Sequence, residues 1–440
     1  MPLTKDEVLA LDTQYNQHPW LPGAAQPLAI ARAEGVYFWD YDGKKYIDLS
    51  SQLTCNNIGW GNQKVSDAIK AQLDEFAYLA PAHAFAGKSQ LAERLVKLAN
   101  GDNPDAFAKV FFTLGGSDAN EAALNMARTV TGRPKILSRY RSYHGSTLGS
   151  GNISGDPRRF SLEKPAANGF LKFFDPYLYR APIAFADDAE ASAYYLRQLE
   201  EQIIYEGADE IAAVFIEPIT GANGVIIPPG GYLQGLRALT QKYGILLVAD
   251  EVMAGFGRTG KAFAHQHWGI VPDIISFAKG VTSSYAPLGG VIVSREIADY
   301  YQDKVFQFGL TYSGHPLGIA AGNACLDFYE ETALFDHVQE LGTHFAARLD
   351  ALAAKHAIVG EVRHIGLFGA VELVKDPDTK EPYVPYGGNL GQVFALLRAA
   401  GISTYGRENN INVTPPLTIT KAELDEALDI LDHVLGEINK

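Results

Sequence analysis

Short apolar runs separated by longer amphipathic stretches occupy the middle of the chain, between residues 108 and 293. The runs cover residues 110–112, 136–137, 212–216, 245–249, 274–278 and 291–293. Strands that are apolar on both faces and alternate with helices are typical of a mainly parallel sheet with helices on both sides. The pattern therefore predicts a large α/β domain in which these runs are the strands.

The two ends of the chain mix helices with short strands. The stretch YFWDYDGKKYIDL predicts two strands joined by a turn at Asp42 and Gly43, and residues 62–98 have the apolar spacing of surface helices. After residue 330 the pattern is helical, becomes strand-like at GLFGAVELV, and ends in an amphipathic helix with a capping box of Thr420 and Glu423. We expect residues 1–60 and 330–440 to form one small α+β domain beside a large domain of residues 61–329.

Composition and charge exclude several classes of protein. The chain has 440 residues, 47% hydrophobic and 20% charged, which suits a large core and excludes a disordered or collagen-like chain. Its 37 basic and 51 acidic residues give a net charge of −14, so we expect neither nucleic acid nor a membrane as a partner. The 2 cysteines give no disulfide framework, and no signal-like or bilayer-spanning apolar segment occurs in the sequence. We expect a cytoplasmic protein.

One glycine-rich stretch, GFGRTG at residues 255–260, matches the pattern of dinucleotide-binding proteins and, with Lys261, most of a phosphate-binding loop. The strand before it ends in two adjacent carboxylates that would repel a pyrophosphate, and Ala262 stands where that loop needs Ser or Thr. A Rossmann-type nucleotide-binding protein is therefore the less favoured alternative. His265 and His267 lie on different faces of a helix and no third ligand is near, so we expect no metal.

A second glycine turn connects a predicted strand to a helix in FFTLGGSDANEAALNMAR. The helix is expected to start at Ser117, with Asp118 and Glu121 as its capping pair. A glycine turn before a helix N-terminus offers backbone N–H groups and the positive end of the helix dipole to an anion. Gly116 and Ser117 are thus candidates for a phosphate site, and an ordinary strand-to-helix turn is the alternative.

Three successive apolar strands end in an ionisable residue: GILLVAD in Asp250, AAVFIEP in Glu217 and IISFAKG in Lys279. Parallel strands bring such residues to one edge of the sheet, where α/β proteins bind ligands. A lysine there either forms a structural ion pair or, with its pKa lowered in a dry cleft, acts as the nucleophile that forms a Schiff base. Together with an anion site, these residues predict pyridoxal phosphate chemistry, in which a carboxylate keeps the ring nitrogen protonated.

The sequence resembles the class III (omega) aminotransferases of the fold type I pyridoxal-phosphate family over nearly its whole length. The most specific stretches are SRYRSYHGST, FIEPITGANGVIIPP, LLVADEVMAGFGRTG, FAKGVTSSYAPLGG and TYSGHPLG. The resemblance implies that Lys279 and Asp250 are catalytic, the former as Schiff-base former and proton shuttle, the latter as partner of the pyridine nitrogen. It implies a cofactor site made of Gly116, Ser117, Tyr143, His144, Glu217, Asp250, Val252, Lys279 and Thr311.

The resemblance also implies a homodimer, or a tetramer of paired dimers, in which Thr311 reaches the phosphate of the neighbouring subunit. Arg407 would hold a carboxylate or sulfonate, and Trp60 and Tyr143 would line the substrate pocket. Met253 stands where glutamate-using relatives often carry Gln, which favours pyruvate as acceptor. We therefore expect a ping-pong transaminase that takes nitrogen from a primary amine or ω-amino acid, such as taurine, β-alanine or alanine. A racemase, aminomutase or decarboxylase with the same cofactor is the alternative.

Overall fold

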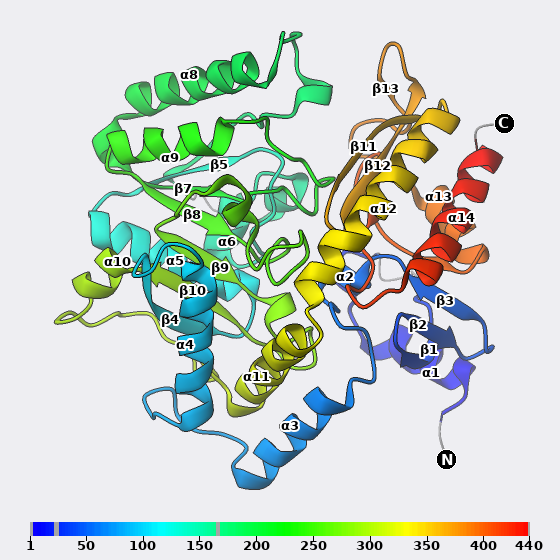
Figure 1. The fold of residues 1–440 in the computed structure, drawn as a ribbon, viewed down its shortest axis with the longest axis horizontal. Coiled ribbons are helices and arrows are strands. Elements are labelled where there is room, and N and C mark those ends of the chain that lie inside the picture. Colours follow the sequence, from blue (N-terminus) through cyan, green and yellow to red (C-terminus); the bar gives the residue numbers. More distant parts are fainter. Residues whose placement is uncertain (1–2, 22–25, 164–167, 439–440) are drawn as a thin grey trace.

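The computed structural model describes residues 3–21, 26–163 and 168–438. Within these residues the chain forms one large sheet, two smaller sheets and the helices around them (Figure 1). No helix in the described part of the chain is both long and apolar enough to cross a membrane.

The large sheet has seven strands among the described residues. In spatial order they are β4 (Phe107–Thr113), β10 (Gly289–Ser294), β9 (Ile274–Phe277), β8 (Leu246–Asp250), β7 (Ile211–Ile216), β5 (Lys135–Arg139) and β6 (Phe170–Phe173). The strands from β9 to β6 are parallel, and β10 runs antiparallel to both of its neighbours. All six predicted runs are therefore confirmed as strands of a mainly parallel sheet, and β6 was not predicted.

Helices cover both faces of this sheet, which explains why its central strands are apolar throughout. On one face α5 (Gly116–Thr131) packs on β7, β9 and β10, and on the other α8 (Asp188–Glu206) and α9 (Tyr232–Lys242) pack over β5, β7 and β8 (Figure 1). The remaining helices around the large sheet are α3 (Gln63–Glu75), α4 (Ala86–Asn100), α6 (Leu148–Ile153), α7 (Phe160–Glu163), α10 (Arg295–Tyr300) and α11 (Pro316–Glu331).

The two ends of the chain lie side by side (Figure 1) because an N-terminal sheet takes up a C-terminal strand. In this sheet β1 (Ile30–Glu34), β2 (Tyr37–Asp40) and β3 (Lys45–Asp48) are antiparallel, and β14 (Ile402–Ser403) pairs in parallel with β3. The predicted turn at Asp42 and Gly43 is confirmed, with Gly43 at a φ of 79°. Along the chain, helix α1 (Lys5–Tyr15) precedes the three N-terminal strands and helix α2 (Ser51–Thr54) follows them.

The third sheet follows in the C-terminal part. It contains β11 (Val359–Ile365), β12 (Phe368–Asp376), β13 (Glu381–Pro382) and β15 (Asn410–Val413), with helices α12 (Leu334–Lys355), α13 (Gly391–Ala399) and α14 (Lys421–Ile438). The capping box at the start of α14 is confirmed, because Thr420 and Glu423 each accept the other's backbone N–H. The domain boundaries at residues 60 and 329 stay a prediction, and this pairing of the chain's ends agrees with them.

Candidate functional site

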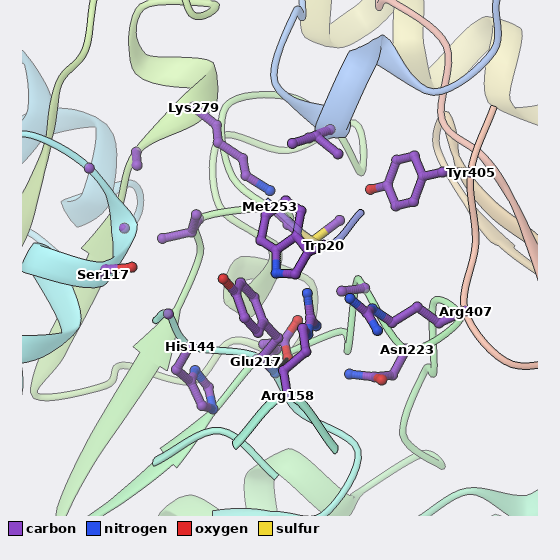
Figure 2. Close-up of a pocket in the computed structure, with 18 of the residues that line it drawn as sticks. Trp20, Ser117, His144, Arg158, Glu217, Asn223, Met253, Lys279, Tyr405 and Arg407 are labelled. Carbon is purple, nitrogen blue, oxygen red and sulfur yellow. Dashed lines mark hydrogen bonds between the residues drawn. The ribbon is translucent and has the colours of Figure 1, made fainter. Parts of the chain in front are cut away.

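A cavity of about 1030 Å³ lies at the carboxyl-end edge of the large sheet. Its wall includes residues that follow β4, β5, β7, β8 and β9, and it is completed by the segment 387–408 from the C-terminal part and by Trp20 and Leu21. Figure 2 shows Lys279 and Ser117 on one side of this cavity and Tyr405 and Arg407 on the other. The sheet edge therefore brings together Asp250, Glu217 and Lys279, as the sequence pattern predicts.

The turn between β4 and α5 forms one end of the cavity. Helix α5 begins at Gly116 and its N-cap is Gly115, with no side-chain cap, so the predicted start at Ser117 is wrong by one residue. Ser117 Oγ accepts instead from the backbone N–H of Ser146, at 3.2 Å. A Cβ on Gly116 would lie 3.0 Å from a methyl of Val252, so these two segments approach each other closely at this glycine.

The predicted capping pair of Asp118 and Glu121 is also wrong. The carboxylate of Glu121 accepts the backbone N–H groups of Gly149 (2.7 Å) and Ser150 (3.0 Å), so it caps the short helix α6 rather than its own helix. An acidic side chain is favourable at that position because it meets the unpaired N–H groups of a helix start.

The carboxylate of Asp250 ends β8 and is buried, with three hydrogen-bond partners around it. Asn120 Nδ2 donates to Oδ2 at 2.7 Å, the ring Nδ1 of His144 lies 2.8 Å from the same oxygen, and the N–H of Val252 donates to Oδ1 at 3.0 Å. Buried carboxylates are stable only with such partners. This set fixes the carboxylate at the cavity wall.

Glu217 follows β7 directly and is buried beside this group. Its carboxylate accepts the backbone N–H of Tyr143 at 3.1 Å and that of Gly221 at 2.7 Å. Burial and the nearby carboxylate of Asp250 together raise the pKa of Glu217 to about 7, against the opposing effect of His144. Glu217 therefore orders the loops that carry Tyr143 and Gly221.

Lys279 follows β9 after one residue and begins a short 3-10 turn. Its φ of 47° is in the left-handed region, which a residue with a side chain adopts only when its surroundings impose it. Its amine points into the cavity (Figure 2) and forms no hydrogen bond with another described residue. Burial lowers the pKa of Lys279, which favours the neutral, nucleophilic amine.

Two arginines lie in the part of the cavity away from Ser117 (Figure 2). The guanidinium of Arg158 lies 3.5 Å from the ring centroid of Tyr143, and its Nε donates to both oxygens of Asp156 at 3.0 Å. Arg407 is half-buried and forms no ion pair with a described residue. Burial, and then the positive charge of Arg158, lower the pKa of Arg407. The pair forms a cationic end that an anion would neutralise.

Most of the predicted site residues line the cavity, and two do not. The ring of Trp60 packs edge to face on that of Phe38, with the ring centroids 5.8 Å apart, and its backbone pairs with Gly35. Within the described chain, Trp60 therefore does not line the cavity. The tryptophan at the cavity is Trp20, whose ring packs edge to face with that of Tyr143, with the ring centroids 6.5 Å apart. Thr311 is exposed on the surface outside the cavity, so its predicted role depends on a second copy of the chain.

Sequence patterns alone did not identify four residues of the site, namely Trp20, Asn120, Arg158 and Tyr405. Asn120 is one helical turn beyond Gly116, so its position on the inner face of α5 could have been inferred from the helix spacing. Trp20 and Arg158 lie in a loop and a short 3-10 turn, where no periodic pattern indicates which way a side chain points.

The GFGRTG stretch forms no anion site. The N–H groups of Phe256 and Gly257 donate to the carbonyls of Ala262 (2.6 Å) and Lys261 (3.1 Å), so the loop uses them internally. A phosphate-binding loop leaves such groups free for the ligand. Arg258, in the same stretch, is fully buried and donates to the carbonyls of Leu367 and Pro415. The stretch therefore joins the large sheet to the C-terminal part.

Comparison with known proteins gives one consistent result. Residues 22–435 match the model of a family described as Aminotransferase class-III. A crystal structure of taurine:2-oxoglutarate aminotransferase from Bifidobacterium kashiwanohense, in complex with PLP and glutamate, is 50% identical, with a TM-score of 0.97 over 100% of this chain and 99% of that one. A thermostable (S)-enantioselective omega-transaminase from Thermomicrobium roseum is 37% identical, with a TM-score of 0.94 and full coverage of both chains (100% each). The taurine–pyruvate aminotransferase of Bilophila wadsworthia is 34% identical over 100% of this chain and 99% of its own length.

Proposed function

Because the chain belongs to the class III aminotransferases, we propose that it moves the amino group of a short ω-amino acid, such as taurine or β-alanine, to a keto acid. The observation that carries this proposal is the cationic end of the cavity, where Arg407 has no carboxylate partner among the described residues and Arg158 lies nearby. A donor with an amine at one end and an acid group at the other would extend from Lys279 to these guanidiniums.

Class III aminotransferases use pyridoxal phosphate, and the cavity has the features that this cofactor needs. Gly116 and Ser117 begin a 16-residue helix whose N-terminus faces the cavity and suits a phosphate. The amine of Lys279 lacks a protein partner in the described chain, and Asp250 presents a fixed carboxylate. The cofactor supplies a carbonyl that binds amines and a ring that accepts electrons from the substrate carbon.

The side chains around the cofactor would act as follows. Lys279 would bind the cofactor and then carry the proton between the substrate carbon and the cofactor, which needs the neutral amine that burial favours. Asp250, held by Asn120 and His144, would keep a proton on the ring nitrogen. Tyr143 and Val252 would contact the ring, and Glu217 would fix the backbone N–H of Tyr143.

Arg407 would bind the acid group of the substrate. A guanidinium donates in a planar fork that matches a carboxylate and also accommodates a sulfonate. Arg158 would add positive charge, although Asp156 already takes up part of its donor capacity. The ring of Trp20, which meets that of Tyr143 edge to face, would cover part of the cavity.

For the acceptor we propose pyruvate, which has a single carboxylate. Met253 favours it, because this apolar side chain at the cavity wall cannot donate a hydrogen bond to the second carboxylate of a dicarboxylic keto acid. A second candidate is 2-oxoglutarate, which two guanidiniums could bind through its two carboxylates. The names of the relatives divide in the same way, since one acts on 2-oxoglutarate and another on pyruvate.

We also propose a homodimer with shared active sites, or a tetramer of two such dimers, in the cytoplasm. Thr311 is exposed, and its carbonyl accepts from the hydroxyl of Tyr78 at 3.0 Å. The exposed rings of Tyr78 and Tyr312 lie against each other beside it, an arrangement suited to an interface. Mixing Thr311→Ala with Lys279→Ala protein should restore activity if the site is shared, because one site of each mixed dimer is then intact. A lack of restoration despite subunit exchange would exclude sharing.

The proposed reaction is tested by following isotopic nitrogen. Purified protein is incubated with ¹⁵N-labelled taurine or β-alanine and either pyruvate or 2-oxoglutarate, and the amino acids formed are analysed by mass spectrometry. We expect ¹⁵N in alanine, and the ratio of labelled alanine to labelled glutamate decides between the two acceptors. Label that leaves as ammonium, or that moves within the donor, would replace the transaminase proposal by one of the alternative reactions.

A further inference from the structure

The loop that carries Arg407 is held by a hydrogen-bond chain that crosses from the C-terminal part to the large sheet. The backbone carbonyl of Arg407 accepts two bonds from Asn410, one from its N–H at 2.9 Å and one from Nδ2 at 3.3 Å. Asn410 is buried at the start of β15. Both its backbone and its side chain are thus used to fix the residue that points into the cavity.

Arg363 of β11 connects Asn410 to the neighbouring loop that follows β7. Its Nη2 donates to Asn410 Oδ1 at 2.5 Å, and its Nε donates to the carbonyl of Gly224 at 2.6 Å. Gly224 is next to Asn223, which lines the cavity and lies beside Arg407 in Figure 2. One guanidinium therefore ties the Arg407 loop to the Asn223 loop.

The contact between these loops is close and admits little movement. Gly224 has a φ of 107°, and a Cβ there would lie 2.6 Å from Asn410 Oδ1 and 2.9 Å from Arg363 Nη2. The same loop is anchored at its other end, where the N–H of Gly221 donates to Glu217 at 2.7 Å. The chain of contacts thus runs from Glu217, beside the cofactor site, to the backbone of Arg407.

The charge of Arg363 is balanced on its other side. Its Nη1 lies 2.9 Å from Glu372 Oε2 and also contacts Glu361, while Arg180 donates to Glu372 at 2.8 Å. This balance holds the guanidinium in place, and it also means that removing Arg363 would leave buried carboxylates unpaired. Asn410 and Gly224 are therefore the better positions at which to disturb the chain of contacts.

We propose that Arg363 and Asn410 are positioning residues that set the distance between the acid-binding guanidinium of Arg407 and the reacting end of the cavity. The inference rests on the proposed function, because it assumes that Arg407 binds the acid group. Displacing a binding group by about 1 Å can change a rate about 100-fold, so the position of the Arg407 loop has a direct effect on selectivity.

A pair of reagents that differ only in an acid group tests the proposal without requiring turnover. Aminooxyacetate and O-methylhydroxylamine both react with the lysine-bound cofactor and abolish its visible absorption, and only the first carries a carboxylate. The ratio of their second-order rate constants, measured by stopped flow on the holoenzyme, is the carboxylate preference. We compare wild type with Asn410→Ala, Gly224→Ala and Arg407→Met, and use Asn409→Ala as the matched control.

Asn409 is a suitable control because it is adjacent and equally buried, and its side chain accepts from the N–H of Val384 rather than from the Arg407 loop. We expect Asn410→Ala and Gly224→Ala each to lower the carboxylate preference about tenfold, with the rate for O-methylhydroxylamine unchanged. We expect Asn409→Ala to leave the preference within about twofold of wild type, which corresponds to about 0.4 kcal/mol.

The outcomes separate this inference from the proposed function. If Arg407→Met does not lower the carboxylate preference, the acid-binding role of Arg407 is wrong. If Arg407→Met lowers it while Asn410→Ala and Gly224→Ala do not, the positioning role alone is wrong. An equal loss of rate for both reagents would also overturn the positioning role, because a purely structural defect does not distinguish the carboxylate. Should Asn410→Ala fail to fold, Gly224→Ala decides the question.

Discussion

Replacing Arg407 by methionine should weaken every ligand with an acid group and spare ligands without one. Arg407 is half-buried and has no ion pair to lose among the described residues, so its removal leaves no protein carboxylate unpaired. A hydrogen bond to a charged group contributes about 1.5–3 kcal/mol, which is about a 10- to 150-fold change in affinity. Because Arg407 is half-buried, water screens its charge only in part, and we expect a change of about 50-fold, near the middle of that range.

The assay is the half-reaction of the holoenzyme with β-alanine, followed by the loss of visible absorption without any keto acid. The dependence of the rate on donor concentration gives an apparent Kd and a limiting rate. For Arg407→Met we expect the apparent Kd to rise about 50-fold, with a smaller effect for Arg158→Met because Asp156 already engages that guanidinium. An unchanged Kd for β-alanine in Arg407→Met would show that Arg407 does not bind the acid group.

Three further predictions concern the rest of the chain. Burial lowers the pKa of Lys172 from 10.5 to about 7, so between these pH values the unfolded chain binds one proton more than the folded chain, and the free energy of unfolding rises with pH. Lys172→Met should reduce this rise by about 1.4 kcal/mol per pH unit, measured by urea unfolding at several pH values. An equal rise in wild type and variant would contradict the prediction. Gly145→Ala, whose Cβ would lie 2.6 Å from Ser117 Oγ, should raise the Kd for pyridoxal phosphate about tenfold or more in a spectroscopic titration, whereas an unchanged Kd would remove the phosphate assignment. Asn120→Ala should lower kcat about tenfold, since Asp250 loses a donor at 2.7 Å, and full activity would argue against that contact.

The sequence was sufficient for the large sheet and for the residues that end its strands. Apolar runs bounded by helices identify the strands, and Asp250, Glu217 and Lys279 then lie at one edge, because parallel strands in an open sheet end there together. The edge strand β6 was missed because its sequence FLKF places a lysine in a short run, and edge strands need not be apolar. The antiparallel direction of β10 has no signal in its apolar composition.

Features that depend on contacts between distant segments could not be predicted. Glu121 has the spacing of a capping residue for its own helix, but α6 comes close enough to take its carboxylate. Trp60 has the character of a pocket aromatic, but its backbone pairing with Gly35 directs the ring towards Phe38. The contact of Arg363 with Gly224 joins segments 139 residues apart, and neither has a local pattern that indicates the other.

The decisive measurement is the identity of the lysine that binds the cofactor. Holoenzyme is reduced with borohydride, which fixes the cofactor on the amine that holds it, and the digested protein is analysed by mass spectrometry. We expect the added mass of the reduced cofactor on the peptide that contains Lys279, because the strand β9 and the turn after it place its amine in the cavity. Modification of a different lysine, with Lys279 unmodified, would contradict it.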